Sequence, residues 1–72
     1  MTALEAKPLW VQADGSLVSC REKLKTLDEN WAEARTVLQD AYDDALLMGV
    51  DEPALRDALL ALVQGLRSPL RP

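Results

Sequence analysis

SCREKLKTLDENWAEARTVLQDAYDDALLM, residues 19–48, holds eight apolar residues that follow one another at alternating spacings of three and four. This spacing places them on one face of a long helix, where they form a heptad seam. No proline interrupts the stretch, and Ser19-Cys20-Arg21-Glu22 matches the capping box that opens a helix. We therefore expect a helix over residues 20–48. The seam residues are Leu24, Leu27, Trp31, Ala34, Leu38, Ala41, Ala45 and Met48.

A second, shorter helix is expected directly after the first. Gly49 stands where a helix end needs a left-handed residue. Asp51-Glu52-Pro53 then supplies an N-cap, an acid in the first turn and a proline that the first turn tolerates. The expected helix covers residues 52–67, and residues 68–72 form a loose tail after it. Its seam consists of Leu55, Leu59, Leu62 and Leu66.

So short a connection makes neighbouring helices run antiparallel, which predicts a helical hairpin. Small side chains of the first helix then oppose large ones of the second, so that the two axes approach closely. The expected pairs are Ala45 with Leu55, Ala41 with Leu59 and Ala34 with Leu66.

A β-hairpin is expected over residues 8–19, because Asp14-Gly15 is a dipeptide that favours a two-residue type I′ turn. That turn pairs Val11 with Val18 and Leu9 with Cys20 on one face. It leaves Trp10 and Leu17 as diagonal neighbours on the other face. The alternative is an irregular extended arm.

The predicted fold is therefore mainly α, in a single domain over residues 1–72. The long helix measures about 43 Å and the short one about 24 Å, so half of the seam lacks a cover within the helical hairpin. Leu24, Leu27 and Trp31 need either the β-hairpin or a second chain against them. A chain of 72 residues has a small core, and its single cysteine forms no internal disulfide. We expect a homodimer whose long helices form a bundle.

Charge and hydropathy exclude several classes of function. The formal net charge is −4 and the sequence pI is about 4.5, which repels the phosphate backbone of nucleic acids. No apolar run approaches the roughly 20 residues that span a bilayer, and the N-terminus has no signal-peptide pattern. We expect a cytoplasmic protein with no nucleic-acid or membrane partner.

No motif for catalysis or cofactor binding is present, and we expect neither an enzyme nor a cofactor. The chain has no histidine, so it forms no Cys–His pair and no structural zinc site with its one cysteine. Cys20 has two interpretations. In the first interpretation, Cys20 lies at the start of a helix beside Arg21 and Lys23, where the pKa of its thiol is lowered and the thiol is reactive. As a continuation of the seam it is an inert, buried residue, which is the interpretation we favour.

Acidic residues gather toward the connection between the helices, where they predict an acidic patch. A solvated helix face near Arg56 is the favoured interpretation, with a basic protein surface as the alternative target. The patch consists of Asp40, Asp43, Asp44, Asp51 and Glu52.

The predicted function is a small non-enzymatic protein–protein interaction module, a homodimeric adaptor or regulatory subunit of an unidentified partner. The first alternative is a thiol-dependent redox or group-transfer role centred on Cys20. The second is a transcription-related nucleic-acid binder, which the charge disfavours. Tryptophans are enriched at interfaces, although core positions are their more common place. The expected interaction surface contains Trp10, Leu17, Leu24, Leu27, Trp31, Leu47, Leu60 and Val63.

Overall fold

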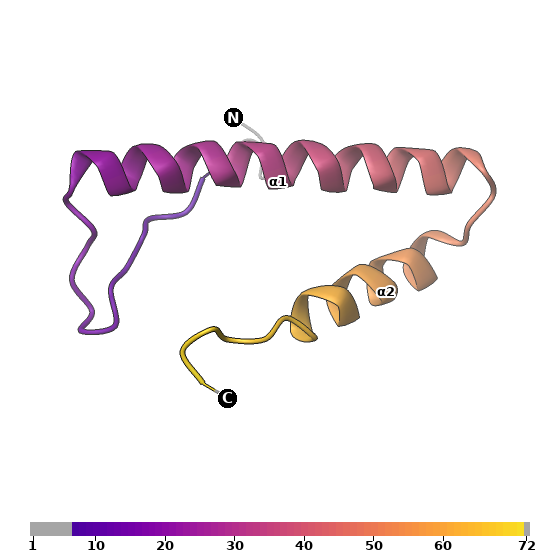
Figure 1. The fold of residues 1–72 in the computed structure, drawn as a ribbon. Coiled ribbons are helices and arrows are strands. Elements are labelled where there is room, and N and C mark those ends of the chain that lie inside the picture. Colours follow the sequence, from indigo (N-terminus) through magenta and orange to yellow (C-terminus); the bar gives the residue numbers. More distant parts are fainter. Residues whose placement is uncertain (1–6, 72) are drawn as a thin grey trace. The chain divides into compact units, whose positions relative to one another are not determined.

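Two helices make up the regular structure of residues 7–71, which the computed structural model describes (Figure 1). They are α1, over Arg21–Leu47, and α2, over Glu52–Gln64. The mainly α fold class is confirmed. The chain divides into two compact units, Met1–Gln39 and Asp40–Pro72, and the boundary between them lies within α1.

The start of α1 uses Cys20 as its cap in place of the expected Ser19. The helix begins at Arg21, and the carbonyl of Cys20 accepts the Leu24 amide at 2.9 Å. The amides of Lys23 and Glu22 lie where they lower the pKa of the Cys20 thiol. Glu22 is therefore the second helical residue, one position too early for the predicted capping box.

The segment before α1 is an extended arm with one isolated bridge, between Val11 and Leu17, so the predicted β-hairpin is wrong. Its turn has three residues, since the Gln12 amide donates to the Ser16 carbonyl at 2.7 Å and the Gly15 amide to the Gln12 carbonyl. Gly15 alone has a positive φ there, of 91°, whereas a type I′ turn also needs one at Asp14. Asp14 instead accepts the amide and hydroxyl of Ser16, at 2.9 and 2.6 Å.

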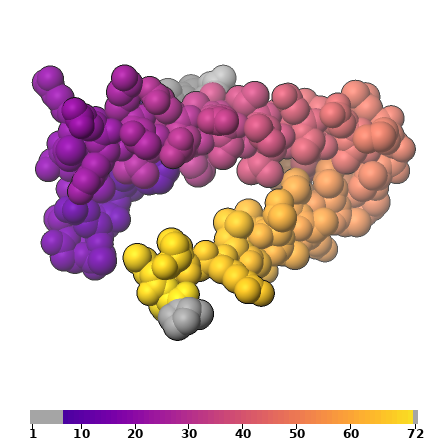
Figure 2. All heavy atoms as spheres, in the orientation of Figure 1, coloured from indigo at the N-terminus to yellow at the C-terminus, as the bar shows by residue number. Residues whose placement is uncertain are grey.

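One additional turn residue shifts the pairing, and so exchanges the faces of the arm. Val11 lies opposite Leu17, not Val18, and both are exposed. Trp10 accepts the Val18 amide at 2.9 Å, and these two side chains are half-buried. In Figure 2 the indigo arm lies directly against the purple start of α1. Leu9 and Cys20, the other expected pair, are exposed.

The connection after α1 matches the prediction closely. Gly49 has a φ of 94°, its amide donates to the Leu46 carbonyl at 3.1 Å, and the Val50 amide donates to the Ala45 carbonyl at 3.0 Å. These two bonds form a Schellman motif. Asp51 then caps α2 by accepting the Ala54 amide at 3.1 Å. The helix ends at Gln64 instead of Arg67, because Gly65 follows as the C-cap.

The face of α1 covered in the second unit is rotated by about one residue from the predicted seam. Tyr42, Ala45 and Leu46 are half-buried there, whereas Ala41 is exposed. On α2 the half-buried residues are Leu55 and Leu59, as predicted. The pairing of Ala41 with Leu59 is therefore not the main contact of α1. Leu66 lies beyond the end of α2. The other exposed seam positions are Trp31, Ala34, Leu38, Met48, Leu62 and Leu66.

Two neighbouring leucines test this rotation. Leu46 is half-buried and Leu47 is 86% exposed. We expect Leu46→Ala to lower the free energy of unfolding by about 1 to 2 kcal/mol, because it removes a side chain that packs in the second unit. Leu47→Ala should change it by about 0.5 kcal/mol or less. Urea denaturation followed by circular dichroism measures both, and equal midpoints for the two variants would contradict the rotated face.

Candidate interaction surface

Apolar side chains of both units remain in contact with solvent. Among residues 7–71 no side chain is fully buried, and the large apolar residues of the arm, α1 and α2 include many exposed ones. Single exposed leucines are ordinary on protein surfaces, but a domain with no buried residue at all is not. The exposed apolar side chains of residues 7–71 are therefore the candidates for an interaction surface.

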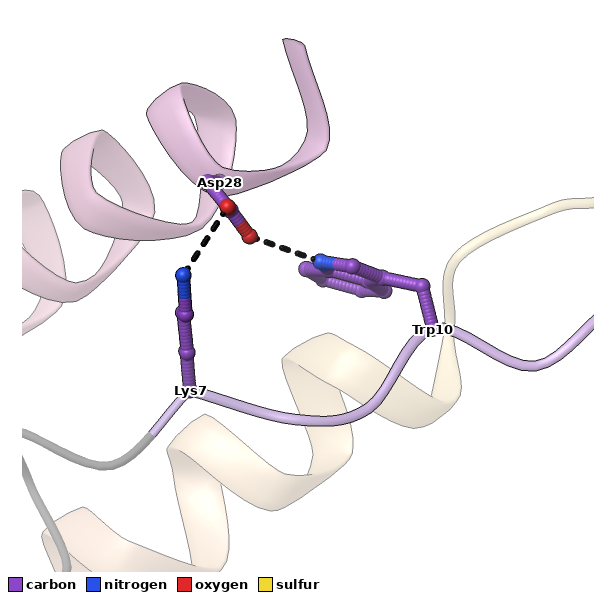
Figure 3. Close-up of polar contacts among 3 residues, drawn as sticks. All are labelled: Lys7, Trp10 and Asp28. Atoms are coloured by element: carbon purple, nitrogen blue, oxygen red, sulfur yellow. Dashed lines mark hydrogen bonds and ion pairs between the residues drawn. The ribbon is translucent and has the colours of Figure 1, made fainter. Parts of the chain in front are cut away.

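The first unit is held together by a polar contact centred on Asp28 of α1 (Figure 3). One carboxylate oxygen accepts the indole N–H of Trp10 at 2.9 Å, and the other accepts the Lys7 ammonium at 3.0 Å. Both partners come from the arm. The contact thus fastens the arm to the second turn of α1 and uses both oxygens of one half-buried carboxylate.

An aromatic contact lies beside it. The rings of Trp10 and Trp31 meet edge to face, with centroids 6.0 Å apart and planes at 78°. Such a pair contributes about 0.5 to 1.5 kcal/mol beyond the area it buries. Leu24 and Leu27 are half-buried in this unit, while Trp31 remains 40% exposed. The arm of the same chain is therefore a partial cover for this part of the seam.

The expected interaction residues divide into two groups. Trp10, Leu24 and Leu27 are half-buried inside the first unit. The others are exposed and remain available. These are Leu17 on the arm, Trp31 and Leu47 on α1, and Leu60 and Val63 on α2.

Cys20 is exposed, so its interpretation as a buried residue is wrong. Hydrogen bonds from the amides of Lys23 and Glu22 lower the pKa of its thiol, and the charge of Lys23 adds to this effect. This direction agrees with the prediction from its place at a helix start, and whether the thiol is reactive stays a prediction.

The acidic residues near the connection differ in what they do. Asp51 caps α2, while Glu52 accepts the Tyr42 hydroxyl and lies 3.8 Å from the Arg56 guanidinium. Arg56 also lies over the Tyr42 ring, 5.2 Å from its centroid. Asp40, Asp43 and Asp44 are exposed on α1. The expected contact of Arg56 with the acidic patch is thus present, at Glu52.

Tyr42, Glu52 and Arg56 together form a polar cluster that joins the end of α1 to α2 within the second unit. The hydrogen bond to the Glu52 carboxylate raises the pKa of the Tyr42 hydroxyl, because it stabilises the protonated phenol. Sequence reasoning gave Tyr42 no role. Its only signal was its position beside the seam, near the start of a helix that carries Glu52 and Arg56 at i and i+4.

Sequence reasoning also missed Asp28 and Lys7. They lie 21 residues apart, and nothing local distinguishes Asp28 from the other charged residues on the outer face of α1. The one available signal was the nearby tryptophan pair, since a buried indole N–H needs an acceptor.

Within residues 7–71, no group of three or more histidine, cysteine, aspartate or glutamate side chains is arranged to hold a metal ion. Neither described helix combines the length and the apolar character needed to cross a membrane. No family model matches the chain, and neither the curated proteins nor the solved structures contain a match. The interaction surface is therefore argued from this structure alone.

The contact at Asp28 predicts an acid-sensitive arm. The indole of Trp10 and the ammonium of Lys7 lower the pKa of Asp28 below its ordinary value of 3.8. The stabilisation is therefore complete above that value and is lost as the pH falls through the lowered pKa. We expect the near-ultraviolet circular dichroism of the tryptophan pair to collapse below about pH 4.

Asp28→Asn should weaken this signal at neutral pH and remove its acid transition. Hydrogen bonds from the Ser16 side chain and amide also lower the pKa of Asp14, at the tip of the arm, so Asp14→Asn is the matched control and should keep the transition. An unchanged acid transition in Asp28→Asn would show that another group holds the arm.

Cys20 gives a second prediction. Alkylation by iodoacetamide, followed against pH, should give an apparent thiol pKa below the value of about 8.5 for a free cysteine. In urea the pKa should rise toward that value, because the amides of Glu22 and Lys23 no longer point at the sulfur. Equal pKa values in the folded and unfolded protein would show that the Cys20 thiol does not take part in the cap of α1.

Proposed function

We propose that this protein is a non-enzymatic protein–protein interaction module that works as a homodimer. The observation that supports it most is that no side chain among residues 7–71 is fully buried, while large apolar side chains of the arm, α1 and α2 are exposed. Association with a second molecule would bury apolar side chains that neither unit covers by itself.

A second copy is the partner we favour. A single chain of this length supplies too little core for ordinary stability, and Cys20 forms no internal disulfide that could compensate. Self-association adds buried apolar area without requiring any other component. The exposed apolar residues of α1 and α2 support this, since both helices carry them. The net charge of −4 counts against a nucleic-acid partner, and the unpaired thiol agrees with a cytoplasmic protein.

A thiol-dependent role remains the second candidate, because Cys20 is exposed and its thiol pKa is lowered. The alkylation experiment above tests this candidate, and an ordinary pKa in the folded protein would exclude it. The interaction function does not depend on that outcome.

Sedimentation equilibrium at micromolar concentration tests the proposed homodimer. We expect a mass of twice 7.9 kDa, with dissociation on dilution. A helical circular dichroism spectrum that weakens together with dissociation would show that association completes the fold. A folded monomer at every concentration up to about 100 µM would contradict the proposal, because the exposed apolar side chains would then not drive self-association.

A further inference from the structure

No further inference is drawn: the strongest candidate, the exposed apolar patch of Ala34, Val37 and Leu38 on the middle of α1, carries nothing because nothing in the structure shows what covers it.

Discussion

The rest of the structure depends on the fact that a single helix cannot cover its own apolar face. α1 has 27 residues, and none of its side chains is buried by the helix itself. Apart from local contacts such as the Lys25–Glu29 ion pair, packing of its apolar face must come from a segment folded back against it. The arm supplies this in one unit and α2 in the other. The arm and α2 each contact α1 through a polar cluster, and a partly exposed carboxylate lies at the centre of each cluster.

These two contacts have the same construction. Asp28 binds Lys7 and the indole of Trp10, while Glu52 binds Arg56 and the hydroxyl of Tyr42. In each, one carboxylate joins a cation and an aromatic residue that has a polar group. Next to the first contact the ring of Trp10 meets the ring of Trp31. In the second, Arg56 lies over the ring of Tyr42. Such contacts fix geometry where there is too little apolar area to do so.

The helices could be predicted because their signals are local. Periodic apolar residues, the cap at Asp51 and the left-handed Gly49 act within a few residues of the helix ends. The pairing in the arm and the covered face of α1 could not be predicted, because each depends on a shift of about one residue. One additional residue in the turn near Asp14 exchanges the faces of the arm. A rotation of about one residue replaces Ala41 by Tyr42, whose larger ring and hydroxyl make contacts that an alanine cannot make.

The aromatic residues are divided between the two units in a way that makes each unit optically distinct. Both tryptophans belong to Met1–Gln39, and the single tyrosine belongs to Asp40–Pro72. Indole emission therefore reports on the first unit and phenol absorbance on the second. α1 is shared by both, so its integrity couples the two signals. Coincident melting curves at the two wavelengths would indicate one cooperative transition, and separate curves would reveal a helix that frays from one end.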